Sequence, residues 1–301
     1  MALSNRDEFG PRQRSFRGMT VPMDVWMDEI VFGESPRWHG GRLWFSDWGA
    51  GRVWSVAQGA EPVLEAEVES LMCIDFLPDG RLLVVSPGAG LLRREPDGSL
   101  VPHADLSAIT ATGWNDIVCD AHGRAYVNSI GFDFPGGEFR PGLVALVDAD
   151  GSVRTVAEGL AFPNGMAIAP DGSTLVVAES YAEKLTAYPI ADDGSLGSPY
   201  SWAATPGDHP DGICFDASGA LWYADVGNQH CVRVREGGEV LDVVDSDRGA
   251  FACALTRDGQ GLDRPLLLVV GQEWGPDTWG GGRRTGQLVA HVAPEHGDGW
   301  P

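Results

Sequence analysis

Residues 209–223 read HPDGICFDASGALWY, and this stretch shows the unit from which the fold is built. A Pro-Asp-Gly segment leads into an apolar run, then a turn that contains glycine, then a second apolar run. Short apolar runs bounded by turn residues are typical of β-strands. The same arrangement begins 47 residues earlier (211 − 164) with Phe162-Pro163-Asn164-Gly165. Two such units in succession indicate an internal repeat.

Glycines that follow the first apolar run of each unit recur along the chain with a spacing of 39, 43, 49, 47 and 40 residues. They are Gly41, Gly80, Gly123, Gly172, Gly219 and Gly259. A strand-like run follows each of the first five directly, and the sixth run comes later, at Leu266–Val270, after an insertion. Each repeat has room for about four strands in about 45 residues, which is the size of one propeller blade.

The sequence therefore predicts an all-β fold, a six-bladed β-propeller, covering residues from about 24 to 294. A β-sandwich or barrel with coincidental turn spacing is the alternative. Closing the ring would pair a strand within Asp24–Phe32 with strands near the C-terminus, such as Gln287–Val292. Proline and glycine never gather into a linker, so we expect one propeller domain over residues 21–301. Residues 1–20 contain four arginines but no following apolar stretch, which predicts a loosely ordered leader rather than a secretory signal.

The formal net charge of −22 excludes nucleic acid and anionic membranes as probable partners, and there is no apolar run long enough to span a bilayer. A small-molecule partner remains, and the sequence predicts no oligomeric state. The five cysteines form an odd set without metal-site spacing. We interpret them as reduced core thiols, which favours a cytoplasmic location.

The loops that enter the innermost strands carry the candidate site, because these strands line the central channel of a propeller. Counting back seven or eight residues from the turn glycines gives an oxygen-bearing side chain in four blades: Glu34, Asn115, Asn164 and Asp211. In the other two blades the position falls near Met72 or Cys73 and near Phe251 or Ala252, which can wall a pocket. Carboxylate and amide oxygens favour one divalent cation, Ca²⁺ first, with Mg²⁺, Mn²⁺ and Zn²⁺ as alternatives. Each of the four could instead be an ordinary turn-capping residue.

Several motifs resemble those of the senescence marker protein (regucalcin)/gluconolactonase family over essentially the whole chain beyond residue 20. They are Gly33-Glu34-Ser35-Pro36-Arg37-Trp38, Trp114-Asn115-Asp116 followed by Gly123-Arg124, Phe162-Pro163-Asn164-Gly165-Met166 and Pro210-Asp211-Gly212. The resemblance implies a six-bladed propeller with one divalent cation held by the residues that match Glu34, Asn164 and Asp211. The residue matching Asn115 would join the metal or contact substrate. Family members hydrolyse sugar lactones, and relatives such as diisopropyl fluorophosphatase cleave phosphorus esters.

The chain departs from the family pattern where a sugar would bind. Members usually carry an arginine two residues before the Asn of the Asn-Asp motif, and this position is Gly113 here. Trp114, Phe132, Phe134 and Phe162 are expected near the mouth, which suggests a more apolar pocket. Trp114 and Asn115 are candidate substrate-binding residues. Glu138 falls roughly where the family has an acid that contacts substrate, although exposure on a loop would also explain it.

The leading hypothesis is a metal-dependent hydrolase of lactones or related esters. The cation would polarise the carbonyl and activate water, and Asp211 would accept the proton of that water or orient it. One alternative is a phosphotriesterase-like or other metal-assisted enzyme acting on a more apolar substrate. Another is a calcium-binding or ligand-binding propeller without turnover, because a fold does not fix a function. Asp116 and Asp225 are expected to support the ligands.

Overall fold

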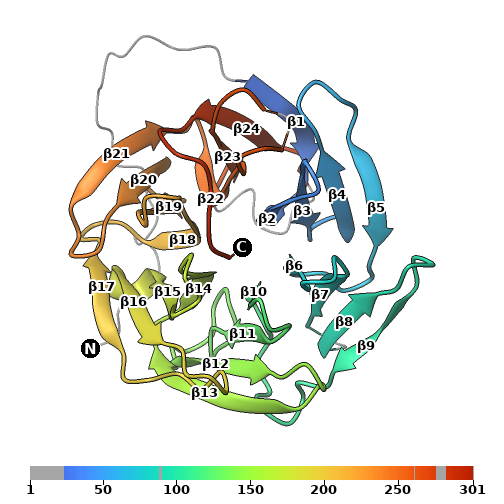
Figure 1. The fold of residues 1–301 in the computed structure, drawn as a ribbon, viewed down its shortest axis with the longest axis vertical. Helices are drawn as coiled ribbons and strands as arrows, with labels where there is room; N and C mark the ends of the chain where they lie inside the picture. The colour runs from blue at the N-terminus through green and yellow to red at the C-terminus, as the bar shows by residue number, and fades with distance from the viewer. Residues whose placement is uncertain (1–23, 88–89, 261, 276–282, 301) are drawn as a thin grey trace.

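A computed structural model describes residues 24–87, 90–260, 262–275 and 283–300. Within these ranges, 24 strands form six four-stranded antiparallel sheets, arranged as blades around a central axis (Figure 1). The predicted all-β six-bladed propeller is confirmed. One short 3₁₀ helix, η1 (Ser180–Ala182), interrupts the strand order. In the described part of the chain no helix has the length and apolar character needed to cross a bilayer. The predicted leader, residues 1–20, lies outside the described residues.

Five blades run from the axis outward in chain order. Blade 1 holds β2 (Gly33–His39), β3 (Arg42–Asp47), β4 (Arg52–Val56) and β5 (Val63–Glu67), and blade 2 holds β6 (Ile74–Phe76), β7 (Leu82–Ser86), β8 (Gly90–Arg94) and β9 (Leu100–Ala104). Blade 3 holds β10 (Ile117–Cys119), β11 (Ala125–Ser129), β12 (Gly142–Val147) and β13 (Val153–Leu160). Blade 4 holds β14 (Pro163–Ile168), β15 (Thr174–Glu179), β16 (Lys184–Pro189) and β17 (Tyr200–Ala204), and blade 5 holds β18 (Pro210–Phe215), β19 (Leu221–Asp225), β20 (His230–Val234) and β21 (Val240–Asp245).

Blade 6 joins the two ends of the chain. It contains β22 (Gly249–Leu255), β23 (Leu266–Gln272) and β24 (Gly286–Val292), and its outermost strand is β1 (Asp24–Ile30). β1 pairs with β24 in a register that places Asp24 opposite Ala290 and Ile30 opposite Gly286. The closing pair is therefore the one that the sequence suggests, and backbone hydrogen bonds hold the ring shut.

Burial and turn geometry explain why these residues form blades. The second strands of the blades, such as β7 and β19, are buried along their whole length between neighbouring sheets. The outermost strands, such as β5 and β21, are mostly exposed or half-buried. All six turn glycines of the repeat have φ between 70° and 84°, a left-handed conformation that other residues rarely adopt. The periodic glycines thus mark the tight turn between the first two strands of each of the first five blades.

The C-terminal segment closes the channel at the end opposite the candidate site. Ile168 and Trp300 exchange backbone hydrogen bonds of 2.6 and 2.9 Å, and the Gly297 amide donates to the Thr256 carbonyl at 2.9 Å. These contacts lie at or just beyond the far ends of β14 and β22, and the chain ends near the axis in Figure 1. The described structure therefore has a channel that opens on the face where the innermost strands begin.

Deleting residues 295–301 should destabilise the propeller, because the tail's hydrogen bonds tie blades 4, 5 and 6 together. The described part of the tail makes five backbone hydrogen bonds to these blades, so the expected loss is about 5 kcal/mol, at roughly 1 kcal/mol for each net hydrogen bond. A fall in Tm of roughly 10–20 °C would follow. Differential scanning calorimetry measures it, with Glu239→Gln at an exposed ion pair as the control. A tail deletion as harmless as that substitution would contradict the closure.

Candidate metal centre

The four oxygen-bearing residues enter the channel at the same level. Glu34, Asn164 and Asp211 are each the second residue of an innermost strand, and Asn115 lies two residues before β10. A glycine follows Asn164 and another follows Asp211, and both allow neighbouring strands to approach closely. A Cβ on Gly165 would lie 2.4 Å from the Asp211 carbonyl oxygen, and one on Gly212 would lie 2.4 Å from the Ala252 Cβ. The Pro-x-Gly repeat therefore reflects tight contact between successive innermost strands.

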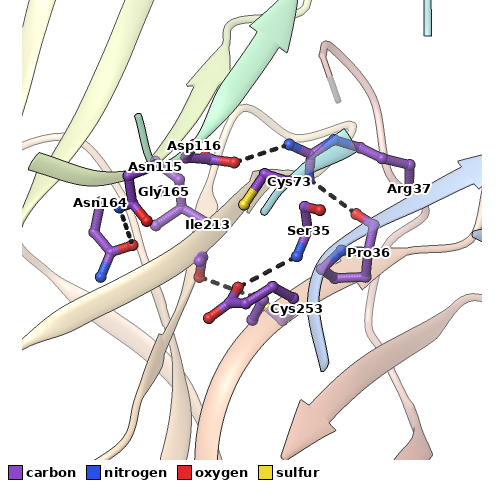
Figure 2. Close-up of a pocket in the computed structure, with 13 residues that line it drawn as sticks. Ser35, Pro36, Arg37, Cys73, Asn115, Asp116, Asn164, Gly165, Ile213 and Cys253 are labelled. Atoms are coloured by element: carbon purple, nitrogen blue, oxygen red, sulfur yellow. Dashed lines mark hydrogen bonds and ion pairs between the residues drawn. The ribbon is translucent and has the colours of Figure 1, made fainter. Parts of the chain in front are cut away.

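Hydrogen bonds join the two amide side chains (Figure 2). Asn115 Nδ2 donates to Asn164 Oδ1 at 3.3 Å and lies 3.4 Å from the Pro163 carbonyl oxygen. Asn164 Nδ2 in turn donates to Ser180 Oγ at 3.4 Å, and Ser180 Oγ donates to the Pro210 carbonyl at 2.8 Å. This chain of contacts links blades 3, 4 and 5 directly beside the channel.

A pocket of about 10 Å³ lies among these residues, which is room for roughly one water molecule or one ion. Its lining includes three of the four predicted residues, namely Glu34, Asn115 and Asn164. Gly212, Cys73 and Ala252 also line it, so the apolar positions predicted for blades 2 and 6 do wall the pocket. Asp211 directly precedes Gly212, and its Oδ1 is buried without a hydrogen-bond partner among the described residues.

Arg37 forms ion pairs with Asp75 and Asp116 rather than with Glu34 or Asp211, and its charge only partly offsets that of Glu34. Burial, with the nearby Asp116 charge, raises the pKa of Glu34 to about 8. Burial and the charges of Glu34 and Asp116 raise the pKa of Asp211 well above its ordinary value. A hydrogen bond from Asn164 acts in the opposite direction but does not cancel this shift. A buried anion and an unpaired buried carboxylate oxygen are both costly. A divalent cation in contact with both would remove that cost, so the donor set fits such an ion.

Arg37 is the basic side chain in the described lining of the pocket, and the sequence analysis assigned it no role. Its Nε lies 3.4 Å from Asp75 Oδ1, and its Nη2 lies 3.3 Å from Asp116 Oδ1. Nη2 also donates to the Ile117 carbonyl at 2.7 Å. One buried guanidinium therefore ties blade 1 to blades 2 and 3. The contacts join residues about 40 to 80 positions apart, which no local pattern reveals.

Asp116 and Asn128 hold the backbone around the candidate ligand Asn164 through hydrogen bonds. Asp116 Oδ2 accepts a 2.9 Å hydrogen bond from the Met166 amide, two residues beyond Asn164. Asn128, which is fully buried, donates from Nδ2 to the Asn164 carbonyl at 2.6 Å and accepts from the Asp116 amide at 3.2 Å. Asp116 thus lies where a supporting acid was expected, whereas Asn128 was missed.

Two predicted substrate-binding residues lie apart from the pocket. Trp114 is 4% exposed and packs in the hydrophobic core between blades 2 and 3. Glu138 is exposed in the loop between β11 and β12 and is not among the described residues that line the pocket. The structure does not bring either side chain to the ligands, so their contact with substrate stays a prediction.

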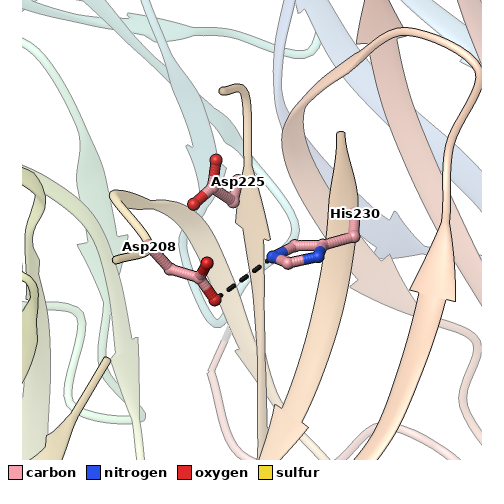
Figure 3. Close-up of side chains that lie close together, drawn as sticks. All are labelled: Asp208, Asp225 and His230. Carbon is pink, nitrogen blue, oxygen red and sulfur yellow. Dashed lines mark hydrogen bonds and ion pairs between the residues drawn. The ribbon is translucent and has the colours of Figure 1, made fainter. Parts of the chain in front are cut away.

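A second group of potential ligands lies in blade 5, on the same face of the propeller as the candidate site. It consists of Asp208, Asp225 and His230 (Figure 3). Ligand atoms of these three side chains lie within 4.8 Å of one another. The two carboxylates also accept hydrogen bonds: Asp208 Oδ2 from the Tyr223 hydroxyl at 2.7 Å, and Asp225 Oδ2 from the His209 amide at 2.7 Å. This network holds the segment that leads into Asp211.

Comparison with known proteins decides the family. Residues 32–264 match the SMP-30/gluconolactonase/LRE-like region. The chain belongs to this family. It is 28% identical over 200 residues to the pentonolactonase XacC of Haloferax volcanii, covering 64% of this chain and 66% of that protein. It is also 28% identical over 170 residues to the diisopropyl-fluorophosphatase of Loligo vulgaris, covering 50% of this chain and 52% of that protein.

A regucalcin structure from Agrobacterium tumefaciens, described as a calcium-binding protein, superimposes with a TM-score of 0.76 at 19% identity. The superposition covers 91% of this chain and 94% of the other. At that identity the likeness establishes the shared propeller fold of this SMP-30/gluconolactonase/LRE-like member.

Replacing Arg37 with Met should destabilise the protein strongly, because Asp75 and Asp116 would keep buried charges without a partner. We expect a loss of about 3–5 kcal/mol in the free energy of unfolding, measured by urea denaturation. Arg52→Met is the matched control, because Arg52 pairs with Glu67 at an exposed site. That control should cost less than about 1 kcal/mol. Equal effects of the two substitutions would contradict the role of Arg37.

The His230–Asp208 pair should make stability fall as pH rises above neutrality. Burial opposes charging of His230, but the hydrogen bond and charge of Asp208 outweigh it and raise the His230 pKa above its ordinary value. The pair's contribution is therefore complete below the unfolded pKa of about 6.5 and is lost as pH rises through the folded pKa. His230→Gln should remove this dependence, which begins near the unfolded pKa of about 6.5 and extends to higher pH.

His291→Gln is the matched comparison for that experiment. Burial lowers the pKa of His291, so its contribution has the opposite sign and is lost as pH falls. Urea denaturation at a series of pH values measures both slopes. Identical pH profiles for the wild type and His230→Gln would contradict the predicted ion pair.

Proposed function

We propose that this protein is a divalent-metal-dependent hydrolase of lactones or related esters. The observation that carries the proposal is a pair of poorly neutralised carboxylates, the half-buried Glu34 and the buried Asp211, beside the amides of Asn115 and Asn164. Membership of a family with lactonase relatives supports a hydrolytic enzyme acting on a small molecule. The five buried thiols support a reducing, cytoplasmic setting.

Glu34, Asn164 and Asp211 would hold the cation, with Asn115 as a fourth ligand or a substrate contact. These hard oxygen donors favour Ca²⁺ over soft metals. When bound, the ion would polarise the lactone carbonyl and lower the pKa of a water molecule. Arg37, Asp116 and Asn128 keep the ligand loops in register through the contacts described above.

Water is the nucleophile that the pocket best supports. The described lining offers three hydroxyl or thiol side chains: Ser35, Cys73 and Cys253. Burial and nearby anionic side chains raise the pKa of Cys73 well above its ordinary value, so that thiol stays protonated and unreactive. The pKa of Cys253 is raised as well, by neighbouring thiols and burial. Ser35 Oγ accepts the Ile74 amide at 2.9 Å and lacks a histidine partner among its described contacts. Asp211, beside the pocket, would orient the water or accept its proton.

A phosphotriesterase-like activity is the second candidate, favoured by the match to diisopropyl-fluorophosphatase and by the missing arginine at Gly113. The same cation and ligands would serve an attack of water on phosphorus. A panel that sets lactones beside organophosphate triesters distinguishes the two reactions. A protein that binds the cation but turns over neither class would be a ligand-binding propeller.

Substitution of the proposed ligands should remove both metal and activity. Glu34→Gln, Asn164→Ala and Asp211→Asn should each reduce the bound divalent cation from about one equivalent per chain toward none. Lactone hydrolysis should fall by at least about 100-fold in each. Elemental analysis and initial-rate assays measure the two effects, with Glu239→Gln at an exposed ion pair as the control. Metal content unchanged in all three variants would refute the site.

Gly113→Arg should increase activity on polyhydroxylated lactones. A Cβ at Gly113 meets no atom within 4 Å, so a longer side chain has space beside Asn115. A charged hydrogen bond to a substrate hydroxyl would raise kcat/KM on the order of tenfold. Gly113→Leu adds comparable bulk without donors and should give no gain. Equal rates for the two variants on a sugar lactone would contradict this reading of position 113.

A further inference from the structure

Two clusters of aromatic side chains lie on the face where the channel opens. The first, here the blade 3/4 cluster, consists of Phe132, Phe134, Phe139, Phe162 and Tyr181. The second, here the blade 6/1 cluster, consists of Phe32, Trp48, Phe251 and Trp274. Their loops join the end of a second strand to the start of a third, or lead directly into an innermost strand. All of these segments reach the level of the candidate ligands.

Each cluster is packed as a unit. In the blade 3/4 cluster, ring centroids lie 4.7 Å apart for Phe162 and Tyr181 and 5.7 Å apart for Phe132 and Phe139. In the blade 6/1 cluster, the Phe32 centroid lies 4.3 Å from that of Trp48 and 4.8 Å from that of Phe251. Contacts at these distances are favourable and keep the rings in fixed orientations.

The clusters are tied to the site by sequence and lie on opposite sides of the axis. Phe162 lies two residues before Asn164, Phe32 lies two before Glu34, and Phe251 directly precedes Ala252 in the pocket lining. In a ring of six, blade 1 is opposite blade 4 and blade 6 is opposite blade 3, as Figure 1 shows. A molecule held between Glu34 and Asn164 therefore lies between the blades that carry the two clusters.

The neighbouring hydroxyl groups are already engaged. Thr112 Oγ1 lies 2.9 Å from Ser129 Oγ and 2.8 Å from Thr110 Oγ1, and Ser129 Oγ donates to the Gly113 carbonyl at 2.8 Å. Since Ser129 donates to the Gly113 carbonyl, the hydroxyl protons along this chain are committed, and a polyhydroxylated ligand would find acceptors here but no free hydroxyl donor. An apolar substituent needs no such donor and gains from leaving water.

We propose that the substrate is a lactone or ester with an apolar substituent, alkyl or aryl, that lies between the two aromatic clusters while the carbonyl reaches the ligands. The proposal rests on the hydrolase function above and names the substrate class of that site. Phe139 is the most accessible probe, because its side chain is 49% exposed in the blade 3/4 cluster. Replacing this side chain with alanine tests the blade 3/4 cluster without leaving a cavity in the hydrophobic core.

The experiment compares three γ-lactones: one without a substituent, one with a pentyl group and one with several hydroxyl groups. The lactam analogue of each is tested beside it. Lactams resist hydrolysis, so their binding reports on the pocket independently of catalysis. We expect the pentyl lactam to bind at least about tenfold more tightly than the bare ring, and the pentyl lactone to show a similar gain in kcat/KM. Isothermal titration calorimetry and initial rates measure these ratios.

Phe139→Ala should reduce the ratio of pentyl to bare-ring affinity at least about threefold. Tyr200→Ala is the matched control, because Tyr200 is 41% exposed on the outer strand β17. Equal binding of the three lactams, tighter binding of the hydroxylated one, or an unchanged preference in Phe139→Ala would overturn the inference. Preferential binding of the pentyl lactam without hydrolysis of any lactone would support it and count against the lactonase function instead.

Discussion

Buried negative charge at the channel entrance is the constraint on which the rest of this structure depends. Asp211 is buried and Glu34 half-buried at this entrance, and the buried Asp116 adds a third acid nearby. Arg37 pairs with Asp116 and Asp75 and only partly offsets the charge of Glu34. A folded protein keeps such carboxylates when something positive binds there. The proposed cation, the supporting hydrogen bonds and the chemistry all follow from that imbalance.

The propeller brings this charge together because six innermost strands begin at one level around one axis. Close approach of β14, β18 and β22 requires Gly165 and Gly212, and closure through β1 and β24 keeps the strands from separating. The aromatic side chains that precede the candidate ligands pack within the two aromatic clusters. One arrangement of strands thus fixes the positions of both the candidate ligands and these clusters.

The sequence predicted the fold because its signal is local and repeated. Each turn glycine obeys the same φ requirement, and each ligand lies a nearly constant distance before it, so counting along the chain also found the positions that the structure brings together. Arg37 and Asn128 could not be found this way, since their partners lie in other blades. Glu138 is predicted from its place in a loop where the family has an acid that contacts substrate, and Trp114 from its position next to Asn115. Neither observation determines where a side chain points. The hydrogen-bonded group of Asp208, Asp225 and His230 likewise depends on the pairing of three strands.

The most direct test of the account is a crystal structure of the protein grown with Mn²⁺, a divalent ion that oxygen ligands accept and that gives an anomalous signal. The account predicts one strong anomalous peak in the channel, within coordination distance of oxygens from Glu34, Asn164 and Asp211. A peak only at Asp208, Asp225 and His230, or none in the channel at saturating Mn²⁺, would contradict it.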